Sequence, residues 1–181
     1  MYKRIAIIFQ TVIIFLLPIN ARTAAVWWGT DDMYVTARHY IETESELGAE
    51  MILPESPLET VGADVLYIVA HGWTDGNSGG ISLFGDNGTE YRLPFPVLLN
   101  NAAKNGIRSI VIDSCYSGLA ADAARERKIR ICVMAGCTGD ELMPVSADGS
   151  LFSLLWTPGT VPENKYSVKG HTIHPQTYRL P

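Results

Sequence analysis

The hydrophobic residues of this chain gather in short, nearly continuous runs. Three such runs cover residues 65–70, 109–112 and 129–135, and none shows the alternation of a half-exposed strand. Unbroken apolar runs of this length are typical of strands that are buried on both faces of a parallel sheet. Each run therefore predicts a central strand.

Between these runs, the apolar positions recur at helical spacing. This spacing predicts helices over residues 33–47, 96–105, 119–128 and 151–156. Shorter strands are predicted at 25–28, 50–53 and 166–168, with a hairpin between 81–84 and 91–93. Strands that alternate with helices predict an α/β domain, a three-layer α/β/α sandwich with a mainly parallel sheet.

The first residues have the pattern of an export signal. Lys3 and Arg4 form a basic flank, the apolar run over 5–19 is short for a membrane span, and small residues follow it. We therefore expect a signal peptide at 1–21 and one domain at 22–181. A secreted or periplasmic location follows, without a membrane span once the signal is removed.

Composition and charge narrow the class of protein further. With 181 residues, 47% of them hydrophobic, the chain can bury one globular core. The net charge is −5, and it becomes −7 when the two basic residues of the signal are lost. An acidic exported domain without a basic stripe is not expected to bind nucleic acid.

Two alternatives stay open for the signal segment at the N-terminus. It could be cleaved after Ala25, or it could remain as an uncleaved anchor.

Two chemically active side chains follow two of the predicted central strands. His71 comes directly after the strand at 65–70, and Cys115 follows the strand at 109–112. The carboxyl ends of parallel strands are where α/β sheets gather their chemistry. A neighbouring imidazole makes the thiolate accessible, and the thiolate is the nucleophilic form. The N–H groups of Gly72 and Cys115 are our candidates for an oxyanion hole.

These residues carry a family resemblance. A strand followed by His-Gly, and then a strand followed by Asp-Ser-Cys-Tyr-Ser-Gly at residues 113–118, resembles the caspase-like cysteine peptidases, nearest to the metacaspases. The loop at 136–141 and the segment at 149–153 are similar to the part of that domain after its fifth strand. The resemblance covers residues 26–156 and implies a caspase-like fold.

The resemblance also implies roles for single residues. Cys115 would be the nucleophile and His71 the general base of a cysteine endopeptidase that acts on peptides or proteins. Asp113 matches the acid that lines the pocket for Arg or Lys before the cleaved bond, and Asp140 matches a second acid. Gly139 departs from the pattern, because another acid often stands there. The family's acid-rich calcium segments have no counterpart among scattered residues such as Asp32, so we expect no metal and no cofactor.

Other interpretations stay open at this point. The chain could be a catalytically silent caspase-like module that binds protein partners, with Cys115 as a buried structural thiol. Asp113 could cap the helix that begins near Ser117. Residues 76–80 spell the serine motif G-x-S-x-G around Ser78, but we predict no strand before it and no helix after it, so a glycine loop is favoured.

The remaining cysteines leave a further choice. Cys132 and Cys137 could form a disulfide, or both could be buried thiols. Because the cysteine count is odd, at least one thiol remains unpaired, and we expect it to be Cys115.

Overall fold

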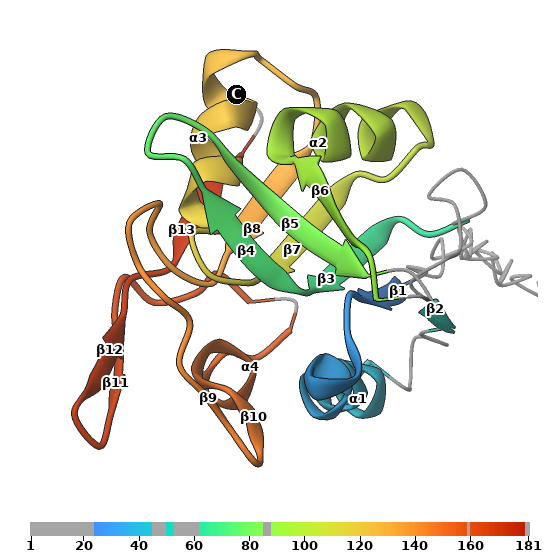
Figure 1. Ribbon diagram of the computed structural model, residues 1–181. Helices are drawn as coiled ribbons and strands as arrows, with labels where there is room; N and C mark the ends of the chain where they lie inside the picture. Colours follow the sequence, from blue (N-terminus) through green and yellow to red (C-terminus); the bar gives the residue numbers. More distant parts are fainter. Residues whose placement is uncertain (1–23, 45–49, 53–61, 85–87, 159, 180–181) are drawn as a thin grey trace, which may run out of the picture.

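The computed structural model describes residues 24–44, 50–52, 62–84, 88–158 and 160–179, so the predicted signal peptide lies outside the described residues (Figure 1). The elements at its centre, in chain order, are β1 (Ala24–Trp28), the 3-10 helix η1 (Asp31–Met33), α1 (Tyr34–Thr43), β2 (Glu50–Ile52), β3 (Val65–Val69), β4 (His71–Thr74), β5 (Gly79–Phe84), β6 (Glu90–Pro94), α2 (Phe95–Lys104), β7 (Ser109–Asp113), α3 (Gly118–Glu126) and β8 (Cys132–Ala135). The C-terminal elements are β9 (Val145–Ser146), β10 (Gly149–Ser150), α4 (Leu151–Leu155), β11 (Tyr166–Val168), β12 (His171–Ile173) and β13 (Gln176–Tyr178).

A six-stranded sheet forms the centre of the molecule, and its strand order is β13-β8-β7-β3-β1-β2. Every neighbouring pair is parallel except β8 with β13. The prediction of a mixed α/β protein with a mainly parallel sheet is therefore confirmed. The pairing of β3 with β7 extends to Val69 opposite Asp113, so these two strands end at the same edge.

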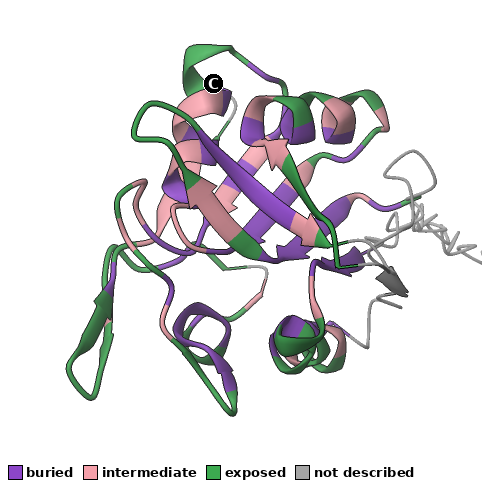
Figure 2. Cartoon of the chain, viewed as in Figure 1, coloured by how far each residue is buried: buried purple, intermediate pink, exposed green. Residues whose placement is uncertain are grey.

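The apolar runs fill both faces of this sheet, because successive strand side chains point to opposite faces. Ala25 and Trp27 belong to the core under α2 and α3, whereas Val26 and Trp28 belong to the core under α1 and α4. Figure 1 shows α2 and α3 on one side of the sheet and α1 and α4 on the other. The central strands are buried along their length, and the outer helix faces are exposed (Figure 2).

A second, three-stranded antiparallel sheet follows β3 almost at once. Within it, β5 pairs with β6 with Ser82 opposite Arg92, which confirms the predicted hairpin, although its turn at 85–87 lies outside the described residues. Strand β4 pairs with β5 as well and was not predicted. Two of its four residues are exposed and the other two are only partly buried, so the sequence carries no strong apolar signal there.

The G-x-S-x-G segment covers the end of the turn between β4 and β5 and the first two residues of β5. The Asp75 carboxylate accepts the N–H groups of Asn77 at 2.9 Å and Ser78 at 2.7 Å, and the Ser78 hydroxyl at 3.0 Å. These hydrogen bonds lower the pKa of Asp75. A strand does precede this turn, contrary to our expectation, but a strand rather than a helix follows it. Ser78 therefore closes a hairpin and does not form a nucleophile elbow.

Two further differences concern strands near the C-terminus. The strand predicted at 129–135 begins only at Cys132, because the Ile129 N–H donates to the Ala124 carbonyl and continues the end of α3. Ile129 is buried by packing and not by strand pairing. Strand β13 was missed, since its Gln-Thr-Tyr sequence is short and polar and follows a proline.

The core under α4 provides a test of these packing assignments. Phe152 is fully buried and stacks on Trp156 with ring centroids 5.0 Å apart. Replacing Phe152 with Ala should lower the free energy of unfolding by about 3–5 kcal/mol, because it leaves a cavity. Leu154 lies on the same helix and is 42% exposed, so Leu154→Ala should change the free energy by less than about 0.5 kcal/mol. Urea denaturation of both variants measures the difference, and equal losses would contradict this packing.

Candidate active site

The fold brings the segments of the two predicted catalytic residues together. His71 is the first residue of β4, separated from β3 only by Ala70, and Cys115 lies two residues beyond β7. A Cβ atom on Gly72 would lie 1.9 Å from the Cys115 carbonyl oxygen. Only glycine tolerates so close an approach, so the two strand ends touch at this point. The His71 and Cys115 side chains share no hydrogen bond in the described part of the chain.

Cys115 is half-buried, and its sulfur receives a hydrogen bond from the main chain. The Met143 N–H donates to Sγ at 3.3 Å, and an N–H in that position stabilises negative charge on sulfur. The next residue, Tyr116, has a φ of 58°, which L residues rarely adopt, and its N–H donates to the Glu141 carbonyl at 2.8 Å. Strained backbone of this kind concentrates at functional sites.

The other two cysteines lie in different surroundings. Cys137 is fully buried, and this burial raises the pKa of its thiol to about 11. Its Sγ donates to the Ser114 carbonyl at 3.3 Å, so it is held as a buried thiol. All three cysteines are free, and the possible bridge between Cys132 and Cys137 is not formed. Strand β8 separates these two residues by roughly 10 Å or more, beyond the reach of a disulfide.

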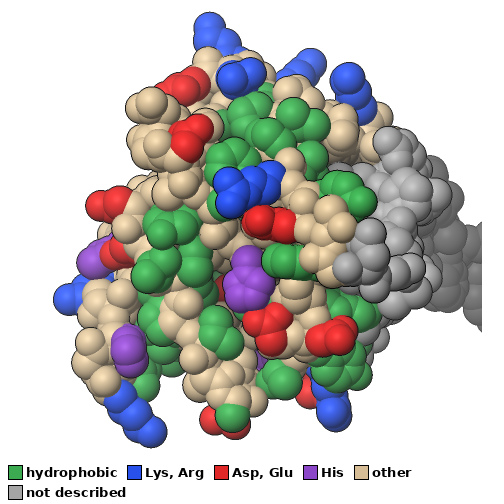
Figure 3. All heavy atoms as spheres, in the orientation of Figure 1, with side chains coloured by type: hydrophobic (Ala, Val, Ile, Leu, Met, Phe, Trp, Pro, Cys, Tyr) green, Lys and Arg blue, Asp and Glu red, His purple; other side chains and the backbone are tan. Residues whose placement is uncertain are grey.

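The His71 ring has a carboxylate partner that the sequence analysis missed. Its Nε2 lies 2.9 Å from Oδ2 of Asp32, which comes from η1 after β1. Slight burial would raise the pKa of Asp32, but the hydrogen bond from Thr30 and the nearby His71 bring it below its usual value. Histidine and acidic side chains lie side by side on this face of the molecule (Figure 3). No motif in the sequence links Asp32 with His71, 39 positions away, and the two side chains meet only because β1 and β3 are neighbours in the sheet.

Asp113 is buried at the end of β7, with 2% of its surface exposed. Its Oδ2 accepts the Tyr40 hydroxyl at 2.8 Å and the Ser150 hydroxyl, which joins β7 to α1 and to the start of α4. Burial raises the pKa of Asp113 to about 6, although both hydrogen bonds act to lower it. Among the described residues, no hydrogen bond ends on Oδ1. The alternative role as a cap of α3 is wrong, because the N-cap of that helix is Ser117.

The remaining predicted residues lie on the strand ends and on the loop that follows β8. Asp140 is exposed, and its Oδ1 accepts the Thr138 hydroxyl at 2.6 Å. The same loop carries Met143, which contacts the Cys115 sulfur. The Cys115 N–H makes no hydrogen bond within the described ranges. The assignment of Gly72 and Cys115 to an oxyanion hole stays a prediction.

Other features of the described residues lie apart from these side chains. An open pocket of about 270 Å³ is lined by Tyr34, Val35, Arg38, His39, Glu42, Ala147 and Asp148, none of which is a predicted site residue. In the described ranges, no three His, Cys, Asp or Glu side chains are grouped as metal ligands. No helix in that part of the chain is long and apolar enough to cross a membrane.

Comparison with known proteins gives no family assignment. No protein-family model matches the chain, and a search of curated proteins finds no significant match. The likeness to caspase-like peptidases therefore rests on the motif residues.

The buried carboxyl of Asp113 predicts a pH-dependent stability difference. Because the pKa of Asp113 rises from 3.8 to about 6 on folding, its ionisation destabilises the folded protein progressively as the pH increases from about 4 to 6. Asp113→Asn has no proton to lose, so its stability relative to wild type should improve by about 3 kcal/mol over that interval. Denaturation curves at pH 3.5, 5 and 7 measure this difference. A difference that is constant with pH would show that Asp113 ionises as easily in the folded protein as in the unfolded chain.

Proposed function

We propose that this chain is an exported cysteine endopeptidase of the caspase-like type, with Cys115 as nucleophile and His71 as general base. The observation that carries the proposal is the contact of Gly72 with the Cys115 carbonyl, where the ends of β3 and β7 meet. This contact brings a thiol and an imidazole to one sheet edge. A mainly parallel sheet with helices on both sides is also what the resemblance implies, so the proposal includes a three-layer caspase-like fold.

The contacts of the His71 ring support its proposed part in the reaction. Nε2 faces the Asp32 carboxylate, and this pairing favours the tautomer in which Nε2–H donates to Oδ2. Nδ1 then remains the basic nitrogen, free to accept the Cys115 proton. Asp32 holds the ring and stabilises the imidazolium that forms, as the carboxylate of a nucleophile–base–acid triad does.

The reaction then runs in two halves. The Cys115 thiolate attacks the substrate carbonyl, and the N–H groups of Cys115 and Gly72 stabilise the oxyanion. His71 donates its proton to the leaving amine, and an acyl-enzyme is left on the sulfur. In the second half, His71 removes a proton from water as the water attacks the thioester, and the free thiol returns.

A preference for Arg or Lys before the cleaved bond is part of the proposal. Among the described residues, both hydrogen bonds to Asp113 end on Oδ2, and Oδ1 would receive the substrate cation. A desolvated carboxylate interacts more strongly with a guanidinium than an exposed one does. Asp140, exposed on the loop after β8, would add negative charge at the entrance.

The position at which β1 begins supports the proposal of an export signal at residues 1–21. Strand β1 begins at Ala24, and Ala25 is its second residue, paired with Leu66 and with Glu50. A cut after Ala21 leaves the strand whole, whereas a cut after Ala25 would remove two of its residues. We therefore favour the first cut and a secreted or periplasmic protein.

Cleavage of short fluorogenic peptides tests the activity. The purified protein should cleave peptides that end in Arg or Lys faster than peptides that end in Asp or Asn, and Cys115→Ala should abolish this turnover. Turnover that survives in Cys115→Ala would rule out the thiol mechanism. No cleavage of any peptide by wild type would favour the catalytically silent module that binds partners.

The role of Asp32 is tested by substitution with Asn. Asp32→Asn should lower kcat by roughly tenfold with little change in KM, because the ring loses its orienting charge but the substrate keeps its contacts. Asp31→Asn is the matched control, since Asp31 is exposed in the same short helix and is expected to leave kcat unchanged. Equal kcat values for the two variants would remove Asp32 from the mechanism.

A further inference from the structure

The loop after β8 contacts Cys115 and its neighbour at two points. The Met143 N–H donates to the Cys115 sulfur at 3.3 Å, and the Glu141 carbonyl accepts the Tyr116 N–H at 2.8 Å. The Cys137 sulfur also lies 3.5 Å from this carbonyl. The main chain around Glu141 thus holds the left-handed conformation of Tyr116, which persists only when the surroundings impose it.

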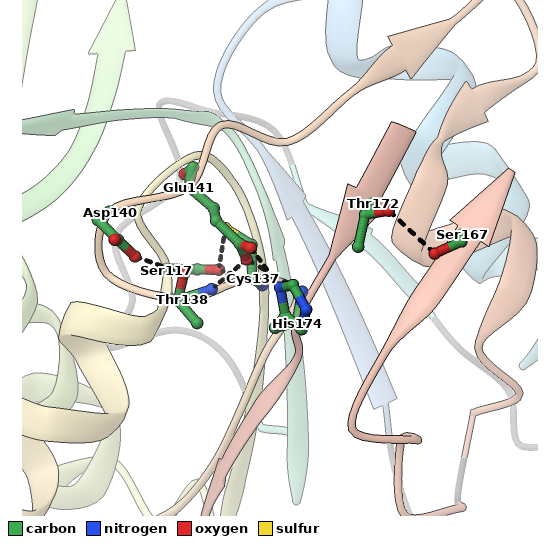
Figure 4. A network of polar contacts seen from close by, with 8 residues as sticks. All are labelled: Ser117, Cys137, Thr138, Asp140, Glu141, Ser167, Thr172 and His174. Carbon is green, nitrogen blue, oxygen red and sulfur yellow. Dashed lines mark hydrogen bonds and ion pairs between the residues drawn. The ribbon is translucent and has the colours of Figure 1, made fainter. Parts of the chain in front are cut away.

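The Glu141 side chain is in turn fixed by three donors. Its Oε2 accepts the N–H groups of Thr138 and His174, each at 3.0 Å, and its Oε1 lies 2.5 Å from Nδ1 of His174. The side chain is only 23% exposed. Burial would raise the pKa of Glu141, but these hydrogen bonds bring it to about 2. Figure 4 shows the Glu141 carboxylate and the His174 ring facing each other across the loop and the C-terminal segment.

His174 is held in place by the central sheet. It lies between β12 and β13, and β13 pairs with β8 with Gln176 opposite Ala135. Ile173, directly before His174, is fully buried in the core under α1 and α4. Strand β13 and the buried Ile173 therefore fix the position of His174. Because His174 contacts the Glu141 carboxylate, it can in turn fix that side chain.

We infer that Glu141 is a positioning residue for Cys115, and that the C-terminal segment holds it through His174. The carboxylate anchors the loop to the sheet edge, and the loop's main chain then places the N–H that faces the sulfur and the carbonyl that fixes Tyr116. The inference rests on the proposed function in that Cys115 is the reacting group. It adds a part of the chain, residues 171–178, that the motif resemblance does not cover.

The reactivity of Cys115 toward iodoacetamide tests this role, with the modified peptide quantified by mass spectrometry. Glu141→Ala should slow alkylation of Cys115 at pH 7 by roughly five- to tenfold, because the sulfur loses the Met143 N–H that stabilises its anion. Glu141→Gln keeps an acceptor for the two N–H groups and should lie between Ala and wild type. Unchanged or faster alkylation in both variants would overturn the inference.

A double-mutant comparison separates this link from general loosening of the fold. His174→Gln should slow alkylation, and the double variant Glu141→Ala, His174→Gln should be no slower than Glu141→Ala alone, because the two side chains act as one unit. Additive losses would contradict the link. Glu42→Gln is the control, since Glu42 forms an exposed pair with Arg38 on α1 and should react as wild type does.

The peptide assay distinguishes failure of this role from failure of the proposed function. If wild type cleaves peptides, Glu141→Ala should lower kcat more than it changes KM. Cleavage that Glu141→Ala leaves unchanged would overturn the positioning role alone. If the variants change alkylation as expected but wild type cleaves no peptide, the positioning role is supported and the proposed peptidase activity is wrong.

Discussion

The structure depends on the parallel pairing of β3 with β7 at the centre of the sheet. Because these strands run side by side to Val69 and Asp113, whatever follows each of them must meet at one edge. One strand continues into His71 and Gly72, and the other into Cys115. The absence of a side chain at Gly72 lets the two backbones touch. The candidate dyad is thus a consequence of strand order and of one glycine.

Three carboxylates near this edge differ in what their surroundings allow them to do. Asp32 is exposed, pairs with an imidazole and has a lowered pKa. Glu141 is mostly buried, accepts N–H donors as well as an imidazole, and has a pKa of about 2. Asp113 is almost fully buried and accepts only hydroxyl groups among the described residues, so desolvation prevails and its pKa rises to about 6. Desolvation thus outweighs the hydrogen bonds only at Asp113, the most deeply buried of the three, whereas the hydrogen bonds outweigh a smaller desolvation at Asp32 and Glu141.

The loop after β8 links the candidate site to the C-terminal segment and the central sheet. It supplies the N–H that faces the Cys115 sulfur, while its own carboxylate is tied to the C-terminal segment at His174. The same segment adds the antiparallel strand at the sheet edge. A neighbouring thiol, Cys137, lies buried beneath the loop and is kept protonated by that burial. The two cysteines thus differ in their surroundings, because Cys115 is half-buried and Cys137 is fully buried.

Local pattern was sufficient for the central strands, for the four helices to within a few residues, and for the placement of His71 and Cys115 at strand ends. These features follow from apolar runs and helical spacing, which short segments carry by themselves. The carboxylate partners of the two histidines could not be predicted from local pattern. Asp32 contacts His71 across 39 positions of the chain, and Glu141 contacts His174 across 33. The sequence determined which strands are buried and which side chains follow the ends of those strands. Only the tertiary structure decided which carboxylates reach them, because such contacts depend on the order in which the strands pair.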